Sequence, residues 1–358
     1  MNVLTWRVFF AVAALSCGSC GGASSATRQI RLRPAPDRET TDPPAGLVAR
    51  LQTRTHVVLL GTGTPNADPA RQGPSLAVVV NGSPYLVDCG PGIVRRAALA
   101  HRRGIRALDV KKLNRVFLTH LHSDHTVGLP DLLYTPWVLG RNAPLQIYGP
   151  PGTRNLATHI SQAYREDVQV RLRGLEPAND QGHRVSAVDV APGPIYRDGS
   201  VAVRAFEVRH GAWKHAYGLR FITPDLHVCV SGDTRPFPGL ARAFAACDLL
   251  IHEVYSLAGF RRRPKRWQRY HAASHTSAPT LGRIASQVNP GLLVLIHQLR
   301  WGTTERGLLR EVHQHFRGRA VSGSDLMVIG LSRGYTRPSA GRPGRGRILT
   351  AQLKQTPP

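Results

Sequence analysis

Three histidines and an aspartate lie within six consecutive positions of this chain, as His120, His122, Asp124 and His125. The apolar run Arg115-Val116-Phe117-Leu118 before them is typical of a buried strand. Alternate residues at the end of a strand point the same way, so His120 and His122 can bind one cation from one side. Asp124 and His125 follow where the chain turns, and they can face a second cation. The cluster therefore predicts a site for two metal ions.

Further candidate ligands follow apolar runs later in the chain, at positions where strands would end. They are His210 after Val203–Val208, Asp233 in Ser231-Gly232-Asp233-Thr234, and His297 after Leu292–Ile296. Imidazole and carboxylate suit zinc, and a site without thiolate ligands stays open to substrate. The same donors also suit Mn²⁺ or Fe²⁺. Two such cations can share a hydroxide, lower its pKa and clamp the attacking and leaving oxygens of a displacement.

The order of the expected elements indicates how these positions are brought together. Strands and hairpin signals dominate the first half, including Asn81-Gly82 between two apolar runs. Helices and strands alternate in the second half, while the polar stretch 171–200 has no clear period and is expected to be a loop. This order favours an α/β protein, or α+β in some schemes, in which two mixed sheets pack together with helices on the outer faces. Strand ends from both halves would then meet along one rim.

Composition allows a large domain and indicates the charge of a partner. The chain has 358 residues, with 47 Lys and Arg against 22 Asp and Glu, a formal net charge of +25. Such a charge attracts polyanions at low salt, so an anionic substrate is expected, either RNA or a small phosphodiester. Arginine is spread along the chain, however, so the charge alone does not identify a partner. The sequence leaves the choice between a monomer and a homodimer open.

The N-terminus resembles a secretory signal: Arg7 is followed by a short apolar core and then by small residues up to Ala26. We expect a signal peptide over 1–26, a linker over 27–54, one hydrolase domain over 55–332 and a basic disordered tail over 333–358. No run is long enough to span a membrane. The predicted location is therefore periplasmic or extracellular, with lipidation at Cys17 as an alternative form of export.

Cysteine usage predicts no disulfide framework. Of the five cysteines, Cys89, Cys229 and Cys247 would remain after export, and they lie in apolar surroundings typical of buried thiols.

The motifs together resemble the metallo-β-lactamase superfamily, and within it the ribonuclease Z and arylsulfatase-like branch. The resemblance covers about residues 56–330 and rests on segments in the family's order: Gly61-Thr62-Gly63-Thr64-Pro65, Asp88-Cys89-Gly90-Pro91-Gly92, the His120–His125 cluster, Ser231-Gly232-Asp233-Thr234, His252-Glu253 and His275-Thr276-Ser277. It implies the αββα sandwich of the metallo-β-lactamase fold and two zinc ions. The implied ligands of one zinc are His120, His122 and His210; those of the other are Asp124, His125 and His297, with Asp233 as the bridge.

The resemblance also implies catalytic roles. His275 would protonate the leaving oxygen, Glu253 would orient its imidazole, and Asp124 would help to orient the nucleophile. The histidine at position 210 is chosen over His215 because a metal-binding histidine begins the matching family stretch. Valine follows Glu253, and Thr-Ser follows His275 where ribonuclease Z more often has Ser-Thr. These departures leave the class of leaving group open.

The sequence thus predicts a binuclear zinc hydrolase, with a phosphodiesterase of ribonuclease Z-like chemistry as the leading hypothesis. An arylsulfatase or a lactonase on the same fold is the alternative. A polyanion-binding protein with an idle metal site is an alternative of another class, and an iron oxidoreductase is a third. The segment Arg261–Tyr270, with six cations and two aromatic residues, could hold a phosphate chain or a base, or could be a solvated loop.

Overall fold

The computed structural model describes residues 54–332, 335 and 346–353. The expected signal peptide, Cys17 and nearly all of the expected linker lie outside the described residues, as does most of the expected tail. Among the helices that are described, none combines the length and the apolar character needed to cross a bilayer.

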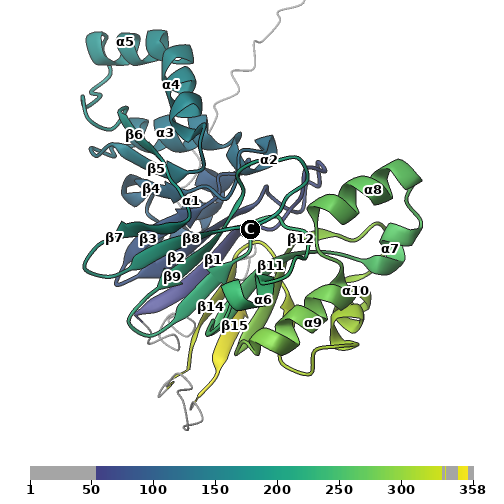
Figure 1. Cartoon of the computed structure of the whole chain (residues 1–358). Helices are drawn as coiled ribbons and strands as arrows, with labels where there is room; N and C mark the ends of the chain where they lie inside the picture. The colour runs from purple at the N-terminus through teal and green to yellow at the C-terminus, as the bar shows by residue number, and fades with distance from the viewer. Residues whose placement is uncertain (1–53, 333–334, 336–345, 354–358) are drawn as a thin grey trace, which may run out of the picture. The chain divides into compact units, whose positions relative to one another are not determined.

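Two sheets form the centre of this part of the chain (Figure 1). The first sheet has the strand order β15-β14-β1-β2-β3-β4-β5-β6. Its strands are β1 (Thr55–Gly61), β2 (Ser75–Val80), β3 (Ser83–Val87), β4 (Arg115–Phe117), β5 (Leu145–Gly149), β6 (Val185–Asp189), β14 (Met327–Leu331) and β15 (Ile348–Gln352).

The second sheet has the order β13-β12-β11-β10-β9-β8-β7. Its strands are β7 (Gly193–Arg197), β8 (Ala202–Glu207), β9 (Tyr217–Ile222), β10 (His227–Val230), β11 (Leu249–Tyr255), β12 (Leu292–Leu299) and β13 (Ala320–Ser322). Both sheets mix parallel and antiparallel neighbours, for example β3 parallel to β4 and β8 antiparallel to β9.

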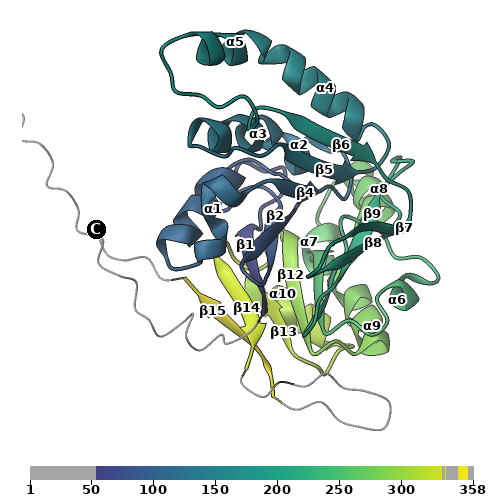
Figure 2. The ribbon, with the colours of Figure 1, turned by 90° about the vertical axis from the view of Figure 1, so that its left-hand side faces the viewer.

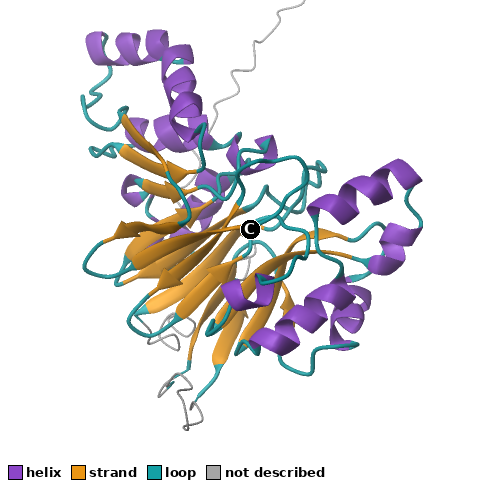
Figure 3. Cartoon of the chain, viewed as in Figure 1, coloured by secondary structure: helices purple, strands orange, loops and turns teal. Residues whose placement is uncertain are grey.

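Helices cover the outer face of each sheet, so that four layers result (Figures 2 and 3). Those on the first sheet are α1 (Ile93–Arg102), α3 (Leu129–Val138), α4 (Thr153–Ala163) and α5 (Arg165–Arg173); those on the second are α6 (Leu240–Ala243), α9 (Ala278–Val288) and α10 (Glu305–His313). The remaining helical elements are the short η1 (Arg106–Leu108), η2 (Val110–Lys112), α2 (Ser123–Thr126) and α7 (Leu257–Arg261), and the longer α8 (Lys265–Ser274). The predicted αββα sandwich is confirmed.

Strand β1 shows why the sequence folds into layers. Val57 and Leu59 belong to the apolar cluster between the sheets, whereas Val58 and Leu60 belong to the cluster beneath α1 and α3. Because side chains alternate along a strand, a continuous apolar run supplies both faces of a strand that is covered on both sides. The Asn81-Gly82 turn between β2 and β3 has positive φ at both residues, as expected for a tight hairpin.

Three segments differ from the sequence expectation. The polar stretch 171–200 contains β6 and β7. Both strands are partly exposed, so their sequences lack the apolar alternation that would have predicted strands. The basic segment near Arg261 forms α7 and α8 rather than a loop. Residues 348–352, expected to be disordered tail, form β15 on the edge of the first sheet. Ile348 and Leu353 are buried in the core, and two such residues at the ends of a short segment are too weak a signal to predict a strand from sequence.

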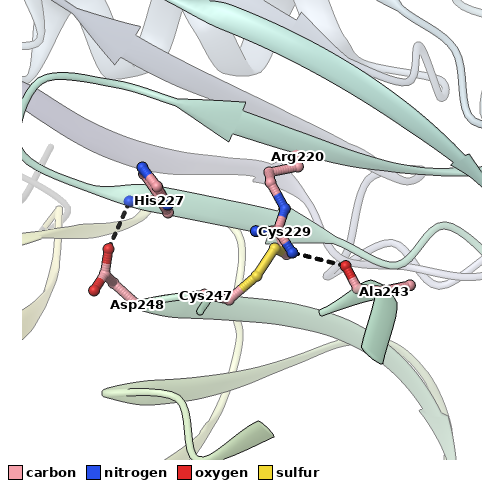
Figure 4. The surroundings of a disulfide bond; sticks show 6 residues. All are labelled: Arg220, His227, Cys229, Ala243, Cys247 and Asp248. Carbon is pink, nitrogen blue, oxygen red and sulfur yellow. Dashed lines mark hydrogen bonds between the residues drawn. A yellow bond between two sulfur atoms is a disulfide. The ribbon is translucent and has the colours of Figure 1, made fainter. Parts of the chain in front are cut away.

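A disulfide joins Cys229 in β10 to Cys247, with the two Cα atoms 6.1 Å apart (Figure 4). The expectation that these thiols are unpaired is therefore wrong. The cysteines are 18 positions apart, but β10 and β11 are parallel neighbours, so Cys247, two positions before β11, returns to the side of β10. Beside the disulfide, the backbone N–H of His227 donates to Asp248 at 2.7 Å.

Candidate metal centre

The candidate ligands come from strand ends of both sheets. His120 and His122 lie in the loop after β4, and Asp124 and His125 lie in the short helix α2 that follows this loop. From the second sheet, His210 follows β8, Asp233 follows β10 and His297 lies within β12. His297 has a φ of 43°, and the pairing of β11 with β12 shifts at this point, so the strand bends to turn this side chain toward the centre. The rim predicted from the strand order therefore exists.

Three imidazoles form the first group of donors. The Nδ1 atom of His122 lies 3.1 Å from Nε2 of His120 and 3.0 Å from Nε2 of His210. Nδ1 of His210 is 2.8 Å from the carbonyl oxygen of Ser274 and must donate its proton there. Its Nε2 atom therefore presents a lone pair toward the other two rings. Three converging nitrogens of this kind fit a shared cation better than a hydrogen-bond network.

Asp124, His125 and His297 form the second group. One oxygen of Asp124 lies 3.3 Å from Nε2 of His297 and 3.5 Å from Nε2 of His125. The Nε2 atom of His125 is buried and has no hydrogen-bond partner within the described part of the chain. A buried ring nitrogen without a hydrogen-bond partner is costly, and a cation bound next to it would remove this cost.

Asp233 lies between the two groups. Its Oδ2 atom is 3.8 Å from Nε2 of His210, and it is 3.7 and 3.6 Å from Nε2 of His125 and His297. The structure thus brings together all seven residues that the sequence singled out as metal ligands. Their donor atoms are imidazole nitrogens and carboxylate oxygens only, which fits zinc, Mn²⁺ or Fe²⁺ in an open site.

Some of these groups already have the protonation state that binds a metal. Burial lowers the pKa of His120 well below its ordinary value, so its ring is neutral at pH 7. Burial alone would raise the pKa of Asp233, but His297 and His125 outweigh it and lower that pKa well below the usual range. Neutral imidazoles and ionised carboxylates are the forms in which these side chains bind metals.

The pKa values of His125 and His297 are instead raised, against the effect of burial. Asp88 and Asp233 raise that of His125, and Asp233 and Asp124 raise that of His297. Those two rings would release a proton when a cation binds.

Asp88 supports the centre from behind and was not assigned a role from the sequence. Its Oδ2 atom lies 2.8 Å from Nδ1 of His125, and both its oxygens accept from the hydroxyl of Thr119. The same hydroxyl lies 3.0 Å from Nδ1 of His120. Asp88 therefore orients one histidine of each group. The Asp88-Cys89-Gly90 motif pointed to a role for Asp88, but the spacing of residues along the chain does not show which side chain its carboxylate contacts.

Glu253 and His275 lie at the edge of the same centre. Nδ1 of His275 is 3.2 Å from Oε2 of Glu253, while the other oxygen of Glu253 accepts from the backbone N–H of Thr276 at 2.7 Å. The same Nδ1 atom is 3.9 Å from Asp233. Burial lowers the pKa of His275 to about 4 and raises that of Glu253 well above its ordinary value. The pair is thus buried, mutually oriented and next to the candidate metals.

His215 lies outside every donor group found among the described residues, whereas His210 belongs to two of them. Trp213, between these two histidines, instead places its ring 5.0 Å from that of His122. The structure therefore places His210, the histidine chosen from sequence, at the centre.

A four-layer αββα sandwich with two groups of metal donors at one rim defines a class of metal-dependent proteins. The family model described as "Beta-lactamase superfamily domain" matches residues 84–298. The chain belongs to this superfamily, in its ribonuclease Z-like branch, and is a metal-dependent hydrolase.

The curated relatives agree with this assignment, and solved structures share the fold. Ribonuclease Z of Mycobacterium avium is 34% identical over 279 residues, which cover 75% of this chain and 96% of that protein. Ribonuclease Z of Mycobacterium marinum is 32% identical over 244 residues, 67% of this chain and 85% of that protein. The short form of human tRNase Z shares the fold, with a TM-score of 0.55, 22% identity and coverage of 79% and 100%. Zn²⁺-bound PqqB from Methylobacterium extorquens does so as well, with a TM-score of 0.55, 16% identity and coverage of 76% and 99%.

Proposed function

We propose that this chain is a binuclear zinc phosphodiesterase with ribonuclease Z-like chemistry. His120, His122 and His210 would hold one ion, Asp124, His125 and His297 the other, and Asp233 would bridge them. The observation that carries this proposal is the position of Asp233, one oxygen of which lies within 4 Å of histidines from both groups. Two zinc ions bound there supply an activated water and neutralise the charge that develops on the phosphoryl oxygens.

Side chains next to the candidate metals would assist the departure of the leaving group and the attack of water. A buried imidazole held by a carboxyl group can, once it is protonated, donate a proton to a departing oxygen, and the His275–Glu253 pair has this arrangement. One oxygen of Asp124 lies 3.5 Å from Nε2 of His125 and 3.3 Å from Nε2 of His297, and this carboxylate would orient the attacking water. The name of the relatives, ribonuclease Z, supports a phosphodiester substrate, as does the net charge of +25.

Parallel assays on the purified full chain test this function. Zinc-loaded protein is offered bis-p-nitrophenyl phosphate, an aryl sulfate and an acyl lactone, and the phosphodiester is expected to have the highest kcat/KM. Asp233→Ala should abolish turnover, whereas Asp131→Ala, a carboxylate on α3, serves as the matched control. Full zinc occupancy without phosphodiester turnover would refute the proposal. Preferred turnover of the sulfate or the lactone would replace it with the corresponding hydrolase.

We further propose that the protein acts outside the cytoplasm. The expected signal peptide indicates export, and the Cys229–Cys247 disulfide supports an oxidising compartment. Fractionation of cells that express the full chain or a chain without residues 1–26 tests this. Equal amounts of both chains in the cytoplasm would contradict it.

A further inference from the structure

The helices α7 and α8 connect Glu253 to His275, and the end of α8 is fixed to the metal centre. The carbonyl of Ser274, the last residue of α8, accepts from Nδ1 of His210 at 2.8 Å. The carbonyl of Ala273 accepts from the backbone N–H of Gly211 at 3.0 Å. The last turn of α8 therefore has a defined position relative to the candidate ligands, and so do the side chains that precede it.

Two partly exposed aromatic rings on α8 extend outward from the centre. Tyr270 and Trp267 are three positions apart on the helix, and each is 41% exposed. The ring of Tyr270 lies 6.2 Å from that of His275, and the ring of Trp267 lies 5.8 Å from that of Tyr270. Buried His271 stacks on Trp267 from below, at 5.7 Å with an interplanar angle of 24°. The series from His275 to Trp267 is thus held in place and open on one side.

Cations lie close in sequence to these rings, and acidic residues do not. From Val254 to Thr304 the chain has no Asp or Glu. Arg262 and Arg263 contact Trp301, the first through its carbonyl and the second over its ring. The remaining cations of the segment are exposed and take part in none of the ion pairs formed by the described residues: Arg261, Lys265, Arg266 and Arg269.

We propose that α8 is the substrate-binding platform of the site and that its occupant is single-stranded nucleic acid. This inference rests on the proposed function, because His275 is taken to protonate the leaving oxygen. The leaving nucleoside then lies next to His275, where the ring of Tyr270 can stack on its base. Trp267 receives the following base, and the four free cations bind the phosphates between them.

The combination of rings and cations favours this occupant over other polyanions. Base–aromatic stacking requires an unpaired base, so a duplex presents only its phosphates to this surface. An acidic peptide would match the charge, but it gives Trp267 and Tyr270 no planar partner. Each stacked base is worth about 1–3 kcal/mol, which corresponds to a loss of roughly 5- to 150-fold in affinity when the aromatic side chain is removed.

Fluorescence anisotropy of labelled oligothymidylate with the zinc-loaded full chain tests the platform. Wild type is expected to bind the single strand more tightly than the same strand annealed to oligoadenylate. Trp267→Ala and Tyr270→Ala should each weaken single-strand binding by about tenfold. Tyr164→Ala is the matched control, because Tyr164 is equally exposed (41%) and lies between α4 and α5 on the other sheet. Trp267→Phe should retain most of the affinity, which separates stacking from a defect in folding.

The cations are tested with a charge-matched pair of variants. Arg266→Ala with Arg269→Ala should weaken binding and reduce its dependence on salt, whereas Arg102→Ala with Arg106→Ala, exposed on the other sheet, should not. Unchanged affinity in the α8 variants, equal affinity for the duplex, or equally effective competition by polyglutamate would each overturn the inference. Because the readout is binding, these results differ from a failure of the proposed function, which is the absence of phosphodiester turnover by the wild type.

Discussion

The carboxylate of Asp88 lies 2.8 Å from Nδ1 of His125, on the side of the ring that faces away from the metal centre. This contact orients the ring, and in the neutral form of His125 it keeps the proton on Nδ1 and leaves the lone pair on Nε2. Burial opposes a charged ring, but Asp88 and Asp233 together raise the pKa of His125 well above its ordinary value. Binding of a cation at Nε2 would therefore displace a proton, while Asp88 keeps its hold on Nδ1.

Replacing Asp88 tests whether this support matters for metal binding. Asp88→Asn keeps the shape but removes the charge, and we expect zinc affinity to fall by about 10- to 100-fold. Competition with a chromogenic chelator measures the affinity. Asp198→Asn is the control, since Asp198 accepts from the hydroxyl of Tyr85 away from the centre. Equal zinc affinity in both variants would show that Asp88 has no role in the site.

Removal of metal should destabilise the fold. Metal that binds the converging donors of the folded chain, and not the unfolded chain, adds RT ln(1 + [L]/Kd) to the free energy of unfolding, about 3–4 kcal/mol at 100 to 1,000 times Kd. Urea unfolding with EDTA, and again after zinc is restored, measures this difference. Asp233→Ala should show a much smaller response because it lacks the central ligand. A midpoint that is the same with and without metal would argue against a bound ion.

The role of His275 predicts a dependence on the leaving group. His275→Ala should reduce kcat for a dinucleotide by about 10²- to 10⁴-fold, because an alkoxide needs a proton as it departs. The loss should be smaller for bis-p-nitrophenyl phosphate, whose leaving group is stable as an anion. Glu253→Gln should show the same selectivity, and His215→Ala should show none. An equal loss on both substrates would assign His275 to metal binding, which its place among the donor groups also allows.

The sequence was sufficient to single out the candidate ligands because each lies at or shortly after the end of an apolar run. His210, Asp233 and His297 are far apart in the chain, but strand ends share one rim, so their meeting follows from topology. The contact of Asp88 with His125 depends on how the loop after β3 faces α2, and no spacing rule gives this. The disulfide was missed for a related reason: Cys229 and Cys247 meet only because β10 and β11 are parallel neighbours.

The disulfide should stabilise the domain under oxidising conditions. A cross-link that closes a loop of 18 residues is worth about 3 kcal/mol, chiefly through the entropy of the unfolded chain. We expect dithiothreitol to lower the free energy of unfolding of the wild type by about this amount. The double variant Cys229→Ala, Cys247→Ala should be less stable and should not respond to the reductant. A wild type that is insensitive to dithiothreitol would place the working protein in its reduced form.

His56 in β1 predicts a loss of stability in mild acid that is independent of the metal ligands. Burial lowers its pKa to about 4, and its Nε2 atom is buried without a hydrogen-bond partner among the described residues. The unfolded chain takes up this proton near pH 6.5 and the folded chain only near pH 4. The contribution of His56 to stability is therefore fully present above pH 6.5 and is lost as the pH decreases toward 4, by at most about 3 kcal/mol.

Urea unfolding at pH 7 and pH 5 tests this contribution. The free energy of unfolding should decrease less between these two pH values in His56→Gln than in His159→Gln, a substitution of an exposed histidine in α4. Both variants keep the same metal centre, so the difference between them isolates the contribution of His56, and equal decreases would show that its ring takes up a proton in the folded state.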